Sequence, residues 1–393
     1  MTSSPIAIVG IGARFAKAKN LQEFWERSLA GEHTFEPVPA DRWDHASFFD
    51  ANPRSRDRSY APTGAWVDEV QTFPAIALQM PPRRAEVMDP QQRLALEVSL
   101  AAIEDSGRSP EELPRNTGVY MGVTAVEYRV LSSGRLMAQM MLSGAFGRPP
   151  EDPEVQKALA ASVENLVAAR PYSAPGVLAN MIAATVTQEL RLKGPSFTTD
   201  AACASSLVAL DSAMKALRDG SVEVALAGGV YLCVTPEHHV AFSRIGAISK
   251  SGVCRPFDQR ADGFVQGDGC GILMLKRLAD AERDGDRIYG VIHGIGSNND
   301  GGSAGPMAPV KEGQIDVVER AWADAKVSPR HLGYIETHGT GTLVGDATEF
   351  EGLAAALAEK MAGGRAGLGS SKANFGHTMS AAGVCGVIRA VLA

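Results

Sequence analysis

One cysteine of this chain has the sequence surroundings of a nucleophile. Cys203 lies in the stretch 196–207, where a β-rich segment leads into the cysteine and a small-residue helix, with apolar residues at helical spacing from Leu207 onward, leaves it. We expect a sharp strand-to-helix turn that leaves the sulfur open to a substrate. Because the thiol would lie near a helix N-terminus, we also expect its thiolate to be favoured. A buried, unreactive thiol is the ordinary alternative for a single cysteine.

Two histidines lie further along the chain in surroundings rich in glycine. His338 ends a short strand-like segment and precedes the loop 339–342, Gly-Thr-Gly-Thr, whose glycines let a ligand approach the backbone. His377 also follows a strand-like piece, with Lys372 five residues earlier and a run of small residues after it. Two histidines, each at a strand-to-loop junction, are harder to explain as structural residues than a single one.

A cysteine with two histidines suits acyl transfer. The thiolate takes an acyl group as a thioester, which divides a difficult transfer into two easier steps. The imidazoles then stabilise negative charge on a thioester oxygen or move a proton. A metal site is a weaker account, because the sequence has no H-E-x-x-H segment and no C-x-x-C pair among its five cysteines, at positions 203, 233, 254, 270 and 385.

Several segments, taken in order, resemble the β-ketoacyl synthases, the condensing enzymes of fatty acid and polyketide synthesis in the thiolase-like superfamily. The resemblance extends over nearly the whole chain. Each segment is a weak signal alone, but together and in family order they make a coincidence very improbable. The segments are IAIVGIG at 6–12, MDPQQR at 88–93, GPS at 194–196, DAACASS at 200–206, RPFD at 255–258, DGF at 262–264, and the two histidine motifs.

The resemblance implies a role for each residue of the expected site. Cys203 resembles the acyl-accepting nucleophile. His338 and His377 resemble the pair that binds the malonyl thioester carbonyl and supports decarboxylation. Lys372 resembles the family lysine that orders the charges around the site, and Glu349 resembles its acidic counterpart.

The reaction implied by the resemblance is a decarboxylative Claisen condensation. Malonyl on an acyl carrier protein would lose CO2 and attack the acyl group bound to Cys203. Thr340 and Thr342 resemble the hydroxyls that hold the pantetheine arm of that carrier. The resemblance implies no metal or organic cofactor, acyl and malonyl thioesters as ligands, and a homodimer. Segments 88–93 and 200–206 favour a polyketide or polyunsaturated-fatty-acid type of synthase.

Other classes of protein remain open at this point. A non-elongating or non-catalytic ketosynthase-like subunit would keep these motifs without condensing substrates. A non-decarboxylating thiolase would use a cysteine and a histidine, but usually a second cysteine as acid, and Cys385 is placed oddly for that role. A Cys/His hydrolase would need water access and an orienting Asn or Asp.

The alternation of strand-like and helical patterns predicts an α/β fold. The resemblance makes this a thiolase-like fold, two similar α/β halves in an αβαβα arrangement, with residues 1–280 carrying the cysteine and 281–393 carrying both histidines. Expected strands are Ile6 to Ile11, Gly118 to Val123, Glu223 to Val230, Gly271 to Leu275, Ile288 to Ile295 and Gly333 to Thr337. Expected helices are Leu21 to Ala30, Pro90 to Ser106, Ser205 to Asp219 and Gln314 to Ala325.

Two departures from the family pattern are visible. The stretch 132–174 is longer than expected and indicates an exposed helical insertion with a helix from Val155 to Ala169. Its methionines suggest a more specific alternative, a cap over an acyl tunnel.

The family continues for a few dozen residues beyond the position of Ala393, so we expect the C-terminal half to be incomplete here. That missing part would carry one donor of the oxyanion hole, which puts activity in question.

The composition places limits on the function. The 393 residues carry a net charge of -7, which favours neither nucleic acid nor an anionic membrane as a partner. The N-terminus lacks the basic and apolar regions of a signal peptide. Because an odd number of scattered cysteines fits a reducing compartment, we expect a cytoplasmic protein.

Overall fold

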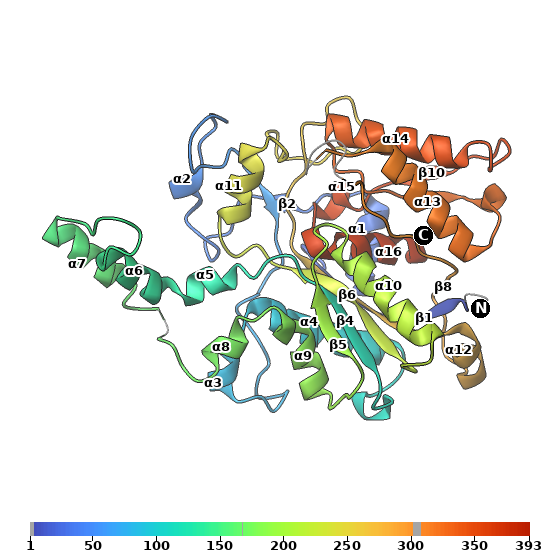
Figure 1. The fold of residues 1–393 in the computed structure, drawn as a ribbon, viewed down its shortest axis with the longest axis horizontal. Coiled ribbons are helices and arrows are strands. Elements are labelled where there is room, and N and C mark those ends of the chain that lie inside the picture. Colours follow the sequence, from blue (N-terminus) through green and yellow to red (C-terminus); the bar gives the residue numbers. More distant parts are fainter. Residues whose placement is uncertain (1–3, 167, 302–307) are drawn as a thin grey trace.

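A mixed six-stranded sheet lies at the centre of the computed structural model, which describes residues 4–166, 168–301 and 308–393. Its strand order is β5-β4-β6-β7-β1-β8 (Figure 1). β4 is parallel to β5 and β6, whereas β7 is antiparallel to both β6 and β1. The strands are β1 (Ile6–Phe15), β4 (Gly118–Gly122), β5 (Ser196–Thr199), β6 (Ala225–Tyr231), β7 (Gly269–Arg277) and β8 (Gly290–Ile292).

Helices cover both faces of this sheet, so its central strands are buried on both sides and read as continuous apolar runs. One face packs against α4 (Pro90–Asp105) and α9 (Asn180–Glu189). The other face packs against α10 (Ser205–Arg218) and α16 (Ala382–Leu392). The two main apolar clusters of the core occupy these two interfaces.

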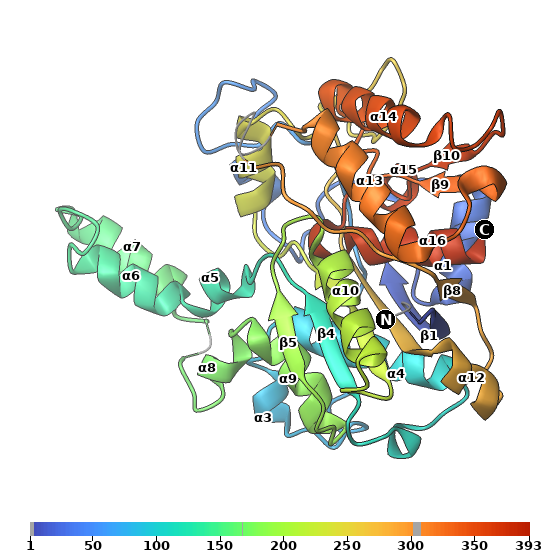
Figure 2. The same cartoon turned by 45° about the vertical axis from the view of Figure 1, so that its right-hand side comes forward.

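A second, smaller sheet lies beyond α16 (Figure 2). It pairs β9 (Tyr334–Glu336) with β10 (Gly367–Gly369) in parallel, and β9 packs against α16. α13 (Lys311–Ala325) and α14 (Leu343–Leu357) pack on each other and form the outermost layer. The succession of helices and sheets gives five layers, αβαβα, as in the expected thiolase-like fold.

The remaining elements are short or peripheral. β2 (Phe35–Glu36) and β3 (Gly64–Ala65) form a two-stranded sheet. No helix in the described ranges is long and apolar enough to cross a membrane. The other helices are α1 (Leu21–Ala30), α2 (His45–Phe48), α3 (Pro82–Ala85), α5 (Tyr128–Ser132), α6 (Gly134–Leu142), α7 (Pro153–Ser162), α8 (Ser173–Gly176), α11 (Glu237–Arg244), α12 (Leu278–Asp284) and α15 (Lys372–Phe375).

The insertion forms an arm of helices α5, α6 and α7 that projects from the body of the molecule (Figures 1 and 2). We define this arm as residues 128–162. The expected helix from Val155 to Ala169 is wrong at both ends. It begins at Pro153, where Asp152 caps the first turn, and ends at Ser162, before the poor helix formers Val163 and Asn165.

Two predicted strands differ from the structure. The strand expected from Ile288 to Ile295 is paired only over β8, and it joins β1 of the first sheet. Beyond β8 the chain runs closely along α13, where a Cβ on Gly294 would lie 2.3 Å from a backbone nitrogen. The strand expected to lead directly into His377 ends at Gly369, and the short helix α15 follows before the histidine.

Candidate functional site

Cys203 lies in the sharp turn between β5 and α10 that the sequence predicts. The residue before it, Ala202, has a φ of 50°, in the left-handed region that costs a non-glycine residue strain energy. The Ser205 hydroxyl accepts a hydrogen bond from Ala201 N–H at 2.9 Å and donates one to the Ala202 carbonyl at 2.6 Å. These contacts hold the strained turn, which leaves Cys203 half-buried at the start of α10.

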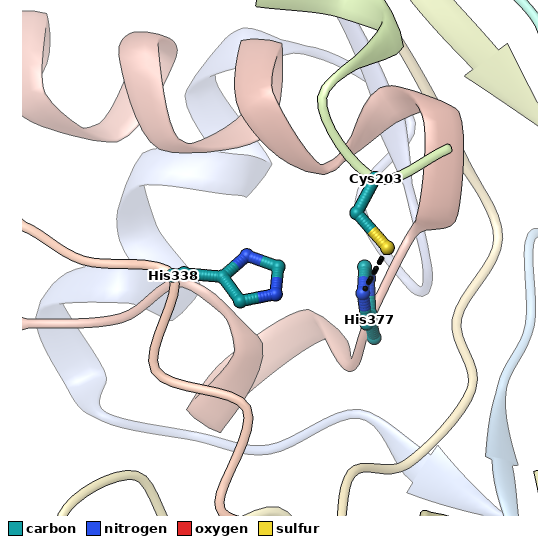
Figure 3. A group of neighbouring side chains, drawn as sticks. All are labelled: Cys203, His338 and His377. Carbon is teal, nitrogen blue, oxygen red and sulfur yellow. Dashed lines mark hydrogen bonds between the residues drawn. The ribbon is translucent and has the colours of Figure 1, made fainter. Parts of the chain in front are cut away.

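His377 contacts the sulfur directly. Its Nε2 lies 3.1 Å from Cys203 Sγ (Figure 3). The backbone N–H of Met379 lies 3.2 Å from Nδ1 of the same ring. Because that N–H can only donate, Nδ1 is the acceptor, and the proton of the neutral imidazole is assigned to Nε2. His377 therefore directs a hydrogen-bond donor at the sulfur, or at an oxygen of a group bound there.

The backbone of His377 is held on both sides by one extended segment. Its N–H donates to the Val265 carbonyl at 2.6 Å, and its carbonyl accepts from Gly267 N–H at 3.0 Å. The ring of Phe264 packs edge-on against the imidazole, with 5.1 Å between the ring centroids. The segment 262–264 stands out in the sequence, but only the fold shows that Phe264 supports the histidine.

His338 completes the group from the opposite side (Figure 3). Its ring lies nearly perpendicular to that of His377, with 5.4 Å between centroids. Glu349, on α14, accepts hydrogen bonds from the backbone N–H groups of His338 at 2.6 Å and Gly339 at 2.7 Å. Glu349 therefore fixes the loop that carries His338, which makes it a positioning residue in this structure.

Lys372 provides the positive charge of the site. Burial raises the pKa of the Cys203 thiol, and the Lys372 charge opposes that rise. Burial, followed by the charges of Lys372 and His338, holds the pKa of His377 well below its usual value. Loss of solvation around its imidazole and the charge of Lys372 lower the pKa of His338, although this residue is exposed to the open pocket. These shifts favour a thiol beside neutral imidazoles, in contrast to the thiolate that the helix dipole alone would favour.

The threonines expected at the pantetheine arm lie in the loop that follows His338. The Thr340 and Thr342 hydroxyls are 3.0 Å apart and half-buried. Asp346 holds this loop by accepting hydrogen bonds from Gly341 N–H at 3.1 Å and Phe257 N–H at 2.6 Å. Sequence reasoning did not select Asp346, although its place in the same Gly-Asp motif could have identified it.

A cavity of about 1030 Å³ opens beside Cys203. Its walls are mainly apolar, and they include one face of α13, whose residues Gln314, Val317, Ala321 and Ala325 recur every three to four positions. Among the described residues, none from the arm lines this cavity. The structure therefore favours the exposed insertion over the cap that the methionines suggested.

The three side chains could also be considered as metal ligands. One donor atom from each of Cys203, His338 and His377 lies within 4.8 Å of the others. A metal-ligating histidine normally donates its second ring N–H to an acceptor, whereas Nδ1 of His377 faces the Met379 N–H donor. The buried ammonium of Lys372 adds a repulsive charge. The donor set therefore fits the stabilisation of an oxyanion better than the binding of a cation.

A cysteine and two histidines brought together between the layers of this α/β fold define a protein of the thiolase-like class. Residues 3–281 match the N-terminal domain of β-ketoacyl synthases, and residues 289–393 match the C-terminal domain. The chain belongs to the β-ketoacyl synthase family.

Similar proteins include large polyketide synthases, of which only a part aligns with this chain. The chain is 39% identical to a phenolphthiocerol/phthiocerol polyketide synthase of Mycobacterium tuberculosis, with 99% of this chain and 20% of that protein aligned. It is 38% identical to polyketide synthase PksN of Bacillus subtilis, over 99% of this chain and 7% of that protein. The chain therefore spans a fifth or less of these two relatives.

Solved structures show the same fold. The oxazolomycin ketosynthase domain OzmH KS7 of Streptomyces albus JA3453 aligns with a TM-score of 0.85 and 33% identity, over 99% of this chain and 62% of that one. The ketosynthase from module 6 of the bacillaene synthase of Bacillus subtilis aligns with a TM-score of 0.82, also at 33% identity, over 99% of this chain and 60% of that one. These matches agree with the five-layered arrangement.

Proposed function

We propose that this chain is the condensing part of a polyketide synthase and catalyses decarboxylative Claisen condensation. The observation that carries the proposal is the donor on His377 Nε2, held 3.1 Å from Cys203 Sγ, with His338 beside it. The family and its polyketide synthase members support this function. Since the relatives are polyketide synthases, we favour polyketide over fatty acid synthesis.

The first step transfers an acyl group to the cysteine. Cys203 Sγ attacks the carbonyl carbon of an acyl thioester, the bond to the carrier sulfur breaks, and the thiol proton leaves with the carrier thiol. The His377 Nε2–H hydrogen bond and the start of α10 stabilise the negative charge that develops on the sulfur. The site then holds a thioester on Cys203 and two neutral imidazoles.

The second step forms the carbon–carbon bond. Malonyl on the carrier loses CO2, and the electron pair of the broken bond becomes an enolate whose oxygen accepts hydrogen bonds from His338 and His377. The enolate carbon attacks the Cys203 thioester, and the cysteine leaves as a thiolate that takes up a proton. The products are CO2, a β-ketoacyl carrier and the free thiol.

The carrier is proposed to be an acyl carrier protein. Its pantetheine arm would lie along Thr340 and Thr342, whose hydroxyls offer hydrogen bonds beside the loop of His338. The hydrogen bonds of Glu349 would hold that loop during turnover, and the charge of Lys372, which lowers the pKa of His338, would keep this histidine neutral. A cytoplasmic location is consistent with the five free cysteines.

We further propose a homodimer and a boundary between the two halves. β5 is an edge strand, and its first two residues, Ser196 and Phe197, are exposed, which leaves hydrogen-bonding groups available to a second copy.

A boundary between 1–280 and 281–393 lies close to the gap between the two family matches, at residues 282–288.

The proposal is tested by mass spectrometry on this 393-residue chain with malonyl carrier protein and an acyl thioester. The expected result is an acyl mass on the Cys203 peptide, CO2 release and a β-ketoacyl carrier. Cys203→Ala should abolish acylation, and His338→Ala should retain acylation while condensation falls by at least about 100-fold. Acylation by wild-type protein without CO2 release or product would reject condensation for this chain.

A further inference from the structure

A buried carboxylate anchors a hydrogen-bond network behind the site. Glu127, which directly precedes α5 at the base of the arm, accepts from the backbone N–H groups of Val234 and Thr235, both at 2.9 Å. The Tyr231 hydroxyl lies 3.0 Å from the same carboxylate. His238, on α11, hydrogen-bonds to both Glu127 and Tyr231. Glu127 and Tyr231 are almost completely buried, so these contacts are shielded from solvent.

Tyr231 extends this network to the segment that holds His377. Gln266 is fully buried, and its Nε2 donates to the Tyr231 hydroxyl. The residues on either side of Gln266 are Val265 and Gly267, which form the two backbone hydrogen bonds to His377. A change in the position of Gln266 would therefore move the strand segment on which the imidazole depends.

The charges of Glu127 and His238 favour strong hydrogen bonds within this network. Burial alone would raise the pKa of Glu127, but the hydrogen bond and charge of His238 lower it below its usual value. Burial alone would lower the pKa of His238, but Glu127 raises it. The carboxylate is therefore an anion, and an anionic acceptor makes a stronger hydrogen bond to the Tyr231 hydroxyl than a neutral one.

We propose that Tyr231 and Gln266, anchored by Glu127, are positioning residues that keep His377 Nε2 in hydrogen-bond contact with Cys203 Sγ. None of the three contacts the sulfur, so they act through the 265–267 segment. Their effect on condensation rests on the proposed function. Their effect on the thiol does not, because it requires only the Nε2–H···Sγ contact.

The test follows the alkylation of Cys203 by iodoacetamide as a function of pH, read by mass spectrometry of its peptide. Tyr231→Phe keeps the ring but removes the hydroxyl. Because a displaced His377 stabilises the thiolate less, we expect the midpoint to move to higher pH and the rate at neutral pH to fall about two- to tenfold. Glu127→Gln should shift the midpoint in the same direction.

Tyr60→Phe is the matched control. Tyr60 lies in the same buried cluster as Tyr231, and its hydroxyl has no hydrogen-bond partner among the described residues. We expect this variant to keep the wild-type midpoint. Should Tyr231→Phe fail to fold, Glu127→Gln carries the same test.

Folded variants at Tyr231 and Glu127 that keep the wild-type midpoint would overturn the proposal, whatever their stability, because a merely structural network would lower stability alone. A shifted midpoint in a protein whose wild type does not condense would support the positioning role and reject the proposed function. The two hypotheses can therefore fail separately.

Discussion

At the scale of single residues, the protonation of Cys203 sets the reactivity of the free site. Burial raises the pKa of its thiol, while Lys372 opposes the rise. This direction favours the protonated thiol at neutral pH, and in the proposed mechanism the helix dipole and His377 stabilise charge only as it develops. This separates the protein from cysteine enzymes that hold a permanent thiolate at rest.

The first prediction concerns this thiol. Its alkylation midpoint is expected above about pH 8.5, the value of an ordinary cysteine. Lys372→Met should move the midpoint higher still, since removing a nearby positive charge disfavours the thiolate. Alkylation by iodoacetamide between about pH 6 and 10 measures both, with Lys360→Met on the exposed surface as control. A wild-type midpoint below that of a free cysteine would contradict the prediction.

A second prediction distinguishes positioning from chemistry at Glu349. Glu349→Ala leaves the N–H groups of His338 and Gly339 without their acceptor, so we expect condensation to fall at least about tenfold, with Cys203 acylation affected less. Steady-state and single-turnover rates measure the two steps. Glu351→Ala, two residues further on α14 and exposed, should match wild type. Equal losses of acylation and condensation would count against a role limited to the His338 loop.

At the scale of elements, a buried ion pair joins the start of β7 to the loop after β2. Arg42 donates to Asp268 at 2.7 Å, and both side chains are almost fully buried. Asp268 also accepts from the backbone N–H groups of Cys233 and Val67. The carboxylate therefore satisfies two buried backbone N–H groups and supplies the countercharge of Arg42, whose guanidinium also donates to the Cys233 and Val67 carbonyls.

We predict that Asp268→Ala destabilises the fold by about 3–5 kcal/mol, because it leaves the Arg42 charge buried and unpaired. Urea denaturation followed by circular dichroism measures the free energy of unfolding. Glu319→Ala breaks an exposed pair with Lys360 and should change that free energy by about 0–1 kcal/mol. Similar decreases in the free energy of unfolding of the two variants would show that burial of an ion pair does not determine how much it stabilises the fold.

The elements also show what local sequence can and cannot predict. α1 has the predicted bounds, because the Asn20 side chain caps its first turn and Gly31 ends it in a left-handed conformation. The Cys203 turn was also predictable from its flanking patterns. The contact between His377 and Cys203 and the packing of Phe264 on His377 were not, since both join segments far apart in the chain.

At the scale of the whole molecule, the proposed homodimer would use the exposed edge strand β5 of the central sheet. Phe197 on β5 is 39% exposed, and its ring packs edge-on against Tyr120. We expect light scattering to give twice the 41.4 kDa chain mass for wild type and a single chain mass for Phe197→Lys. Ile76→Lys, at an exposed site elsewhere, is the control. A Phe197→Lys variant that stays dimeric would place the interface on another surface.

The separation of Cys203 and His377 along the chain has a consequence for biosynthesis. The two residues are 174 positions apart, and the turn that presents the sulfur is built from residues close to Cys203. At ordinary rates of synthesis, His377 emerges roughly 9–35 s after Cys203. During that interval the nascent chain carries Cys203, the proposed nucleophile, without its hydrogen-bond donor. A thiol that stays protonated until the imidazole arrives would limit premature reaction with cellular thioesters while the ribosome completes the chain.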